Sequence, residues 1–301
     1  MSFILLGILN SQAAGGSGGL YVAGGASGYL STSTNGITWT TQTSGFGTSR
    51  IYSVTYGDGL YVAVGESGKL TTSPDGTTWT TRTSGFGSTE ILGVTFGDGL
   101  YVAVGGQYNT SGDITTSPDG ITWTTRTSGF GTDEIFGVAY GDGLYVAVGR
   151  NGTMTTSTNG TTWTTRTSGF GTTSIFGVTY GDGLYVAVGV SGKLTTSPDG
   201  TTWTTRTSGF GTTIIQGVAY GDGLYVAVGR NGTLTTSPDG TTWTTRTSGF
   251  GTSRIYSVTY GDGLYVAVGE SGKLTTSPDG TTWTSRTSGS GSTELQGVTF
   301  G

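Results

Sequence analysis

Residues 51–83 read IYSVTYGDGLYVAVGESGKLTTSPDGTTWTTRT, and close copies of this stretch fill most of the chain. Trp stands at positions 39, 79, 123, 163, 203, 243 and 283, so the spacing is 40 residues with one exception of 44. A repeat near 40 residues with regular aromatic positions is typical of a β-propeller blade. Its Gly, Thr, Val and Tyr are poor helix formers or good strand formers. The sequence therefore predicts an all-β chain of seven blades.

Each copy contains turn residues that divide it into four strands. In residues 51–83 we expect strands at 51–56, 60–64, 69–73 and 77–83, the last holding Trp79. The turns between them are Gly-Asp-Gly at 57–59, Ser-Gly at 67–68 and Pro-Asp-Gly at 74–76. Such sequences supply the positive backbone angles and side-chain hydrogen bonds that tight hairpins require. Four antiparallel strands with short connections make one blade.

The two ends of the repeat region complete each other. Residues 295–300 read as a first strand with nothing behind it, while residues 20–41 supply a second, third and fourth strand. We expect these segments to share one blade, so that the ring closes with one C-terminal and three N-terminal strands and has no open edge. The predicted domains are the propeller at 20–301 and an apolar arm with a Gly-rich linker at 1–19.

The composition excludes several kinds of function. The 301 residues include 60 Gly, no Cys and no His, and the net charge is -5. Without Cys or His the chain lacks the common ligands of zinc, copper and haem, and any Cys–His or Ser–His pair. A surplus of acids does not suit the phosphate backbone of nucleic acids. We therefore expect no cofactor, no metal and no nucleic-acid partner.

The third turn resembles a known motif. Ser73-Pro74-Asp75-Gly76-Thr77-Thr78-Trp79 is similar to the Asp-box of sialidases and related propellers, although one residue shorter. Copies end at Trp123, Trp203, Trp243 and Trp283, and Asn35 and Asn159 replace the Asp in two further copies. In that family the box is a turn device remote from the active site, so the resemblance implies the propeller fold. Calcium at the acidic turns is the less favoured reading, because Asp-Gly turns need Asp for their geometry.

A sialidase-like glycoside hydrolase remains as an alternative function. The resemblance would require three Arg from different blades around a carboxylate, a Tyr nucleophile activated by Glu, and an acid/base Asp. Six of the ten Arg occupy one repeated position of the fourth strand, which we expect to lie on the outer rim, far from the axis: Arg82, Arg126, Arg166, Arg206, Arg246 and Arg286. The sequence therefore favours a protein that is not an enzyme.

Differences between the copies fall in two connections. The first-to-second and third-to-fourth turns hardly change, whereas the second-to-third turn and the crossing to the next blade vary. In an antiparallel blade these two variable connections lie at the same end, so one face of the disc should carry the differences. We predict that this face binds a glycan or a protein partner, unless the differences are tolerated drift in exposed loops. The candidate ligand-binding residues are Tyr29, Arg50, Glu66, Lys69, Glu90, Tyr108, Asn109, Asp113, Glu134, Arg150, Asn151, Lys193, Arg230, Asn231, Arg254 and Lys273.

The charges separate in the same way. Eleven of the 18 acids lie in the two constant turns, and the other seven, with seven of the 13 basic residues, lie in or beside the variable connections. One face is expected to be acidic and the other mixed.

The N-terminal segment lies outside the repeat. Its apolar residues Phe3, Ile4, Leu5, Leu6, Ile8 and Leu9 form a run too short to span a bilayer. It could be a signal peptide ending near Ala13-Ala14, although no basic residue precedes it. We favour an arm that docks on a structural protein partner, because the Gly-rich linker would let it reach a groove or sheet edge.

Such an apolar start before Thr/Gly-rich propeller repeats resembles accessory structural proteins of tailed bacteriophages. The sequence thus predicts a non-enzymatic structural and binding module on a virion or bacterial exterior. An intracellular assembly scaffold is a further alternative to the hydrolase.

Overall fold

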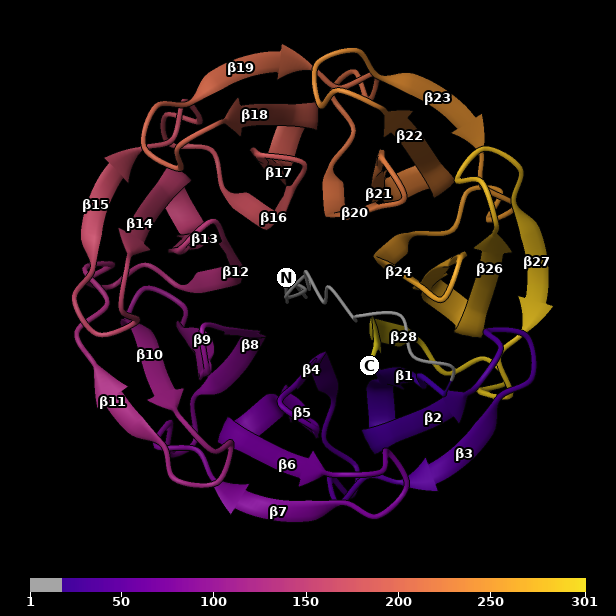
Figure 1. Cartoon of the computed structure of the whole chain (residues 1–301), viewed down its shortest axis with the longest axis horizontal. Helices are drawn as coiled ribbons and strands as arrows, with labels where there is room; N and C mark the ends of the chain where they lie inside the picture. The colour runs from indigo at the N-terminus through magenta and orange to yellow at the C-terminus, as the bar shows by residue number, and fades with distance from the viewer. Residues whose placement is uncertain (1–17) are drawn as a thin grey trace.

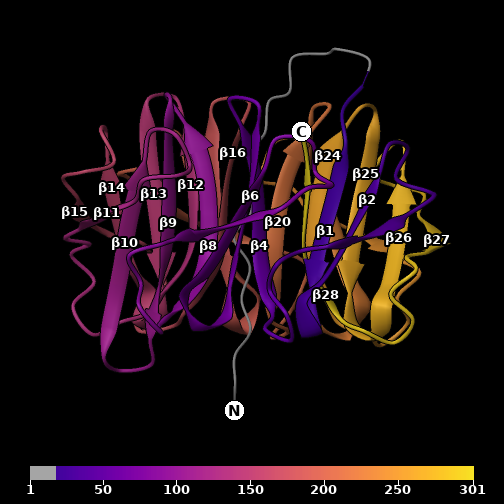
Figure 2. The same cartoon turned by 90° about the horizontal axis from the view of Figure 1, so that it is seen from below.

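A computed structural model describes residues 18–301 as a closed ring of seven four-stranded antiparallel sheets around a central axis (Figure 1). We number these sheets as blades 1 to 7, and each runs from an innermost strand near the axis to an outermost strand on the rim. Seen edge-on, the strands run between two faces of a disc (Figure 2). The predicted fold is confirmed, including the number of blades and of strands in each blade.

The strands, from the inside outward, are as follows. Blade 1 contains β28 (Leu295–Phe300), β1 (Tyr21–Gly25), β2 (Tyr29–Ser33) and β3 (Thr40–Thr43). Blade 2 contains β4 (Ile51–Gly57), β5 (Leu60–Gly65), β6 (Lys69–Ser73) and β7 (Thr80–Thr83). Blade 3 contains β8 (Glu90–Gly97), β9 (Leu100–Gln107), β10 (Ser111–Ser117) and β11 (Thr124–Arg126). Blade 4 contains β12 (Ile135–Gly141), β13 (Leu144–Gly149), β14 (Thr153–Ser157) and β15 (Thr164–Thr167).

Blades 5 to 7 have the same order. Blade 5 contains β16 (Ile175–Gly181), β17 (Leu184–Gly189), β18 (Lys193–Ser197) and β19 (Thr204–Thr207). Blade 6 contains β20 (Ile215–Gly221), β21 (Leu224–Gly229), β22 (Thr233–Ser237) and β23 (Thr244–Thr247). Blade 7 contains β24 (Ile255–Gly261), β25 (Leu264–Gly269), β26 (Lys273–Ser277) and β27 (Thr284–Thr287). One-turn helices join the second and third strands in every blade except blade 3: η1 (Ala26–Gly28), η2 (Glu66–Gly68), η3 (Arg150–Gly152), η4 (Val190–Gly192), η5 (Arg230–Gly232) and η6 (Glu270–Gly272).

The ring closes within blade 1, as predicted. The C-terminal strand β28 pairs antiparallel with β1, so that Tyr21 lies opposite Phe300. The amide of Leu20 donates to the carbonyl of Gly301 at 2.6 Å, and the amide of Gly301 donates back at 3.1 Å. This pairing joins the first and last strands of the propeller without an exposed sheet edge between them.

The hydrophobic core lies between neighbouring blades. Between blades 1 and 2, for example, Val22 and Phe46 pack with Val54 and Ala63, and all four are buried. At the junction of blades 2 and 3 the ring of Phe96 lies directly on Gly57, where a Cβ atom would come within 2.1 Å of it. Only glycine allows this approach, which explains why the residue recurs at the end of each innermost strand.

Turn residues fix the strand ends at one face of the disc. Asp58 and Gly59 have φ angles of 45° and 76°, as a two-residue hairpin of this kind requires. In the turn between the third and fourth strands, at the same face, the Asp75 carboxylate accepts hydrogen bonds from the backbone amides of Thr77 and Thr78, both at 2.8 Å. Because these amides bond to the turn, β7 begins only at Thr80. Our prediction that the fourth strand starts at 77 and includes Trp79 was wrong.

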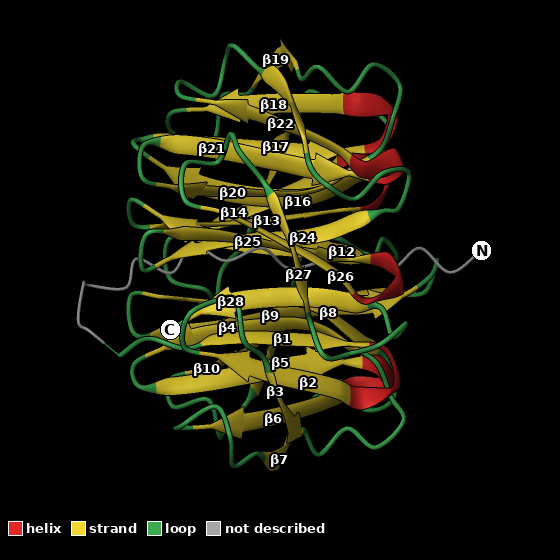
Figure 3. Ribbon diagram, turned by 90° about the vertical axis from the view of Figure 1, so that its right-hand side faces the viewer, coloured by secondary structure: helices red, strands yellow, loops and turns green. Residues whose placement is uncertain are grey.

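Both variable connections reach the same face, as predicted. The one-turn helices gather on one side of the disc (Figure 3). They contact the crossings between blades, as shown by the amide of Glu66, which donates to the carbonyl of Arg50 at 3.0 Å. We call this side the variable face and the opposite side the constant face.

Candidate functional site

Each innermost strand carries a bulge near the variable face. In blade 2 the register between β4 and β5 shifts between Ile51 and Ser53, which leaves Tyr52 outside the ladder. A bulge re-aims its side chain, and here it does so on the strand closest to the axis. The residues at this position differ from blade to blade, in ring order from blade 2: Tyr52, Leu92, Phe136, Phe176, Gln216, Tyr256 and Gln296.

Sequence reasoning missed these seven bulge residues. Their signal was present, because the second residue of the innermost strand varies among copies while Val54 and its equivalents two positions later do not. The bulge residue Tyr52 lies within range of the charges of the residue before its strand and of the first residue of the turn after the second strand. In blade 2 these are Arg50 and Glu66, and the Arg50 amide donates to the Glu66 carboxylate at 3.0 Å. We call these three positions of each blade the mouth residues, because they lie at or beside the variable-face end of the innermost strand, the strand nearest the axis.

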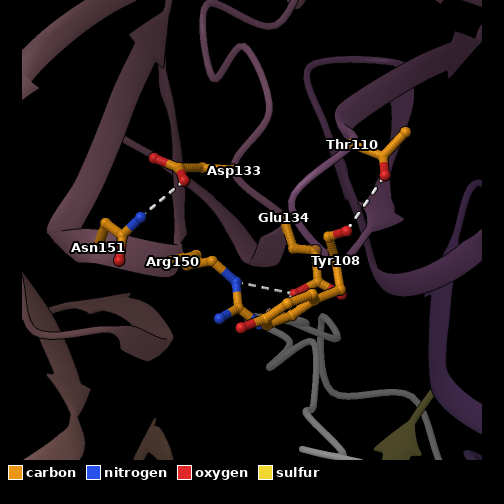
Figure 4. A network of polar contacts seen from close by, with 6 residues as sticks. All are labelled: Tyr108, Thr110, Asp133, Glu134, Arg150 and Asn151. Carbon is orange, nitrogen blue, oxygen red and sulfur yellow. Dashed lines mark hydrogen bonds and ion pairs between the residues drawn. The ribbon is translucent and has the colours of Figure 1, made fainter.

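The most elaborate part of the mouth lies between blades 3 and 4 (Figure 4). Tyr108, at the tip of the longer β9–β10 hairpin, is 59% exposed, and the Arg150 guanidinium lies 4.0 Å from its ring centroid. Arg150 also forms an ion pair with Glu134 at 2.5 Å. Beside them the Asn151 side chain donates to Asp133 at 2.8 Å. Four of the predicted ligand-binding residues are therefore brought together here.

Carboxylates from blades 2, 3 and 4 face one another at the mouth. The Tyr52 hydroxyl donates to Glu90 at 3.2 Å. Burial raises the pKa of the Glu90 carboxyl, and the negative charges of Glu134 and Glu66 raise it further, whereas the Tyr52 hydrogen bond and Arg50 lower it. This side of the mouth therefore favours positive charge.

An apolar arc follows the same ring. Tyr52, Leu92, Phe136 and Phe176 form one buried cluster, and the rings of Phe136 and Phe176 are 5.6 Å apart. Val190 and Ile214 pack against it and are partly exposed. The apolar arc thus extends from blade 2 to blade 6.

Other predicted ligand-binding residues have contacts within the fold. The ammonium groups of Lys69, Lys193 and Lys273 donate to the carbonyls of Phe46, Phe170 and Phe250 at 2.7, 2.8 and 2.9 Å. They fasten the crossing that leads into their own blade, and the Tyr29 hydroxyl does the same through the Ser288 carbonyl at 3.2 Å. Asp113 accepts from the Ser111 hydroxyl at 2.8 Å.

The remaining predicted residues lie at the mouth or beside it. Asn109 and Asn231 are exposed turn residues with φ angles of 52° and 57°. Arg230 and Arg254 lie at the mouth in blades 6 and 7 and are partly exposed.

The repeated Arg lie on the rim. In each of six blades the Arg on the outermost strand donates through Nε to a Thr hydroxyl of the next strand inward, as Arg82 does to Thr72 at 3.0 Å. These Arg do not converge on the axis, as expected.

At the mouth, however, Arg, Tyr and Glu do meet, which the hydrolase alternative requires. Arg50, Tyr52 and Glu90 form one set, and Arg254, Tyr256 and Glu294 form another. Burial, together with neighbouring Glu, raises the pKa of both tyrosines, so their hydroxyls stay protonated. Each set contains one Arg rather than the three that a carboxylate clamp needs.

Two features are absent from residues 18–301. Within them no group of three His, Cys, Asp or Glu is arranged to hold a metal ion. No helix in this part of the chain is long and apolar enough to cross a membrane. The predicted docking residues Phe3 to Leu9 lie outside the described residues.

Comparison with known proteins agrees with the fold. The family model described as the DUF6242 beta propeller domain matches residues 85–209 and 118–260, which together span more than half of the chain. A search of curated proteins finds no match.

Several solved structures resemble the chain. YCF48 from Cyanidioschyzon merolae is 19% identical, with a TM-score of 0.61 over 79% of this chain and 84% of that one. YCF48 bound to a D1 peptide is 18% identical, with a TM-score of 0.61 over 78% and 80%. Virginiamycin B lyase from Staphylococcus aureus is 13% identical, with a TM-score of 0.69 over 79% and 84%. At these identities the likeness shows the propeller fold, and a fold shared by a peptide-bound protein and a lyase does not decide between binding and catalysis.

Proposed function

We propose that this chain, which belongs to the family of the DUF6242 beta propeller domain, is a non-enzymatic platform that binds a protein partner at the mouth of its variable face. The observation that carries the proposal is the exposed Tyr108, which stacks with Arg150 beside the apolar arc. Tyr and Arg beside buried apolar side chains are the residues that dominate binding energy at protein interfaces. The peptide-bound structure of similar fold supports a protein ligand in preference to a glycan.

The contrast between the two faces supports the same site. The constant face repeats the same turns in blade after blade, whereas the three mouth residues differ between most blades. Equivalent blades offer equivalent sites, so a single asymmetric partner needs a mouth whose sectors differ. The long hairpin of blade 3 provides the largest such difference.

Photo-crosslinking tests where the partner binds. We expect benzoylphenylalanine in place of Tyr108 to crosslink to a defined protein when the full chain is present in its source cells or particles. The same probe in place of Ile121, which is 47% exposed on the constant face, is the matched control. Adding Arg150→Ala should abolish the adduct at 108. Identical adducts from both positions, or an adduct at 121 alone, would contradict the proposal.

We further propose that Phe3 to Leu9 attach the propeller to a structural partner on a virion or bacterial exterior. An apolar arm joined by a Gly-rich linker suits this role. Deleting residues 1–17 should release the protein from its assembly while leaving the Tyr108 adduct intact. An assembly that still contains the shortened protein would contradict the docking role of this segment.

A surface glycan is the second candidate ligand of the variable face, favoured by the exposed Tyr108, Asn109 and Asn151. A glycan array probed with the full chain and with Tyr108→Ala separates the two, because only a glycan ligand gives binding that this substitution removes.

A further inference from the structure

Arg230, at the mouth in blade 6, has no counter-ion among residues 18–301. Its Nε atom is buried and has no hydrogen-bond partner among residues 18–301. In that range Arg150 and Glu134 form the one pair of opposite charges within 4.0 Å. The first 17 residues contain no Asp or Glu, so their side chains cannot supply a carboxylate either. A buried guanidinium nitrogen without a partner is costly, which indicates that its partner comes from another molecule.

Blade 4 shows what Arg230 lacks. Arg150 occupies the same position in the same Arg-Asn-Gly turn, and it pairs with Glu134, the residue before the innermost strand. In blade 6 that residue is Ile214, whose carbonyl accepts the Arg230 amide at 3.0 Å but whose side chain carries no charge. The difference between one paired and one unpaired Arg therefore comes from a Glu-to-Ile difference between two copies of the repeat.

A second Arg lies next to this unpaired one. The turn η5, which begins with Arg230, contacts β24, and Arg254 immediately precedes β24. Burial lowers the pKa of Arg230, and the positive charge of Arg254 lowers it further. Two like charges held at one place favour an anion between them.

We propose that Arg230 and Arg254 form an anion-binding site that receives the carboxylate of an Asp or Glu side chain from a protein partner. The inference deepens the proposed function and rests on it. Guanidinium groups hold carboxylates through paired, charge-assisted hydrogen bonds. Ile214 and Val190 lie on the apolar side of the site, where a leucine-like residue next to the acid would pack. This apolar contact favours an acidic peptide over a sugar acid or a free phosphate.

The repeat contains its own control. Residues 48–87 and 252–291 are identical except for Thr81 and Phe86, which are Ser285 and Ser290 in the later copy. Blade 2 therefore has Arg50, Tyr52 and Glu66 where blade 7 has Arg254, Tyr256 and Glu270, and a Glu follows in the next blade in both cases. The preceding blade differs, because Ala26 occupies the position of Arg230. Glu294 also stands where blade 6 has Ile214, so an Arg at position 26 alone would pair with it as Arg150 pairs with Glu134. The double variant Ala26→Arg/Glu294→Ile should therefore build a second site.

Peptide titration tests the site on the full chain. The probe is a fluorescent peptide of alternating Glu and Leu with both ends blocked, followed by anisotropy. We expect Arg230→Ala to weaken binding by about tenfold or more, as the loss of a charge-assisted hydrogen bond predicts, and Arg246→Ala, on the rim of the same blade, to change it by less than about twofold. Ala26→Arg/Glu294→Ile should double the number of peptides bound, whereas Ala26→Arg alone should not, because Glu294 would pair with the new Arg. Arg230→Lys should bind more weakly than the native protein, because the planar fork is lost.

Three results would overturn the proposal. They are equal binding of the peptide with Gln in place of Glu, an equal loss from Arg246→Ala and Arg230→Ala, or stronger competition by inorganic phosphate or N-acetylneuraminate than by the unlabelled Glu peptide. A peptide with Gln in place of Glu, a blocked N-terminus and a free C-terminus separates a terminal carboxylate from a side-chain one. Tighter binding of this peptide than of the Glu peptide would also contradict the proposal. Loss of the Tyr108 adduct with unchanged peptide binding would count against the proposed function alone.

Discussion

At the scale of single residues, neighbouring threonines on β6 have opposite roles. The Thr71 hydroxyl is buried without a hydrogen-bond partner in the described part of the chain, whereas the Thr72 hydroxyl accepts from Arg82 at 3.0 Å. Thr71→Val should leave the free energy of unfolding unchanged or raise it, because it removes an unsatisfied polar group. Thr72→Val should lower it by about 1 kcal/mol, because Arg82 loses a partner. Urea unfolding of the two variants gives the comparison, and a larger loss from Thr71→Val would contradict the structure.

Residue contacts were also the least predictable from sequence. Ligand binding by Lys69 and its equivalents stays a prediction, and the structure adds that their ammonium groups donate to carbonyls such as that of Phe46. The two residues are 23 positions apart, and sequence spacing does not show which carbonyl a long side chain reaches. Arg230 likewise lacks an ion-pair partner because its neighbour across the hairpin is Ile214, whose carbonyl accepts the Arg230 amide.

At the scale of elements, the turns on the constant face respond to pH. In five blades an Asp carboxylate accepts the amides of the turn, as Asp75 does from Thr77 and Thr78, and these hydrogen bonds lower the pKa of Asp75. A folded pKa below the unfolded value means that the stabilisation is complete above about pH 4 and is lost as the pH falls below it. The thermal midpoint should therefore fall between about pH 4 and pH 2.

Two blades supply the control for this pH dependence. Asn35 and Asn159 accept the same turn amides but do not titrate. The side-chain oxygen of Asn35, for example, accepts the Thr38 amide at 2.9 Å. Asn35→Asp should steepen the loss of stability on acidification, and Asp75→Asn should reduce it. Circular dichroism melting at pH 6, 4, 3 and 2 measures both, and parallel curves for all variants would contradict the assignment.

Turn residues made most elements predictable, and side-chain bonds to the backbone account for the errors. In blade 2 the first three strands follow from Gly-Asp-Gly and Ser-Gly, which require positive φ angles at Asp58 and Ser67. The fourth strand was placed too early, because hydrogen bonds from the Asp75 carboxylate to two amides extend the turn. The bulge at Tyr52 was missed because its strand, Ile51–Gly57, reads as a continuous run of strand-forming residues with no turn residue to mark the irregularity.

At the scale of the whole molecule, the two faces of the disc carry different sets of charged residues. The constant face carries 11 acids in its turns and no basic residue, the rim carries six Arg, and the variable face combines seven acids with seven bases. A partner docked on the constant face would have to be basic, whereas the variable face can meet both signs of charge. Long-range electrostatics should therefore turn the variable face toward a partner of mixed charge before any single blade makes contact.

The closed ring also predicts where the chain can be cut. Gly301 and Leu20 pair in blade 1 as Gly57 and Leu60 do in blade 2, where Asp58 and Gly59 form the turn between them. Joining Gly301 to Leu20 through Asp-Gly, omitting residues 1–19, and opening the chain between Asp58 and Gly59 should therefore preserve every blade. Because the seam is one of seven similar sectors, we expect a single cooperative transition with a midpoint within about 4 °C of that of the protein lacking residues 1–17. Opening the same joined chain between Val62 and Ala63 is the matched control, since both are fully buried in β5 and the cut should prevent folding. Equal behaviour of the two permutants in thermal melts would mean that strand continuity within a blade does not hold the ring together.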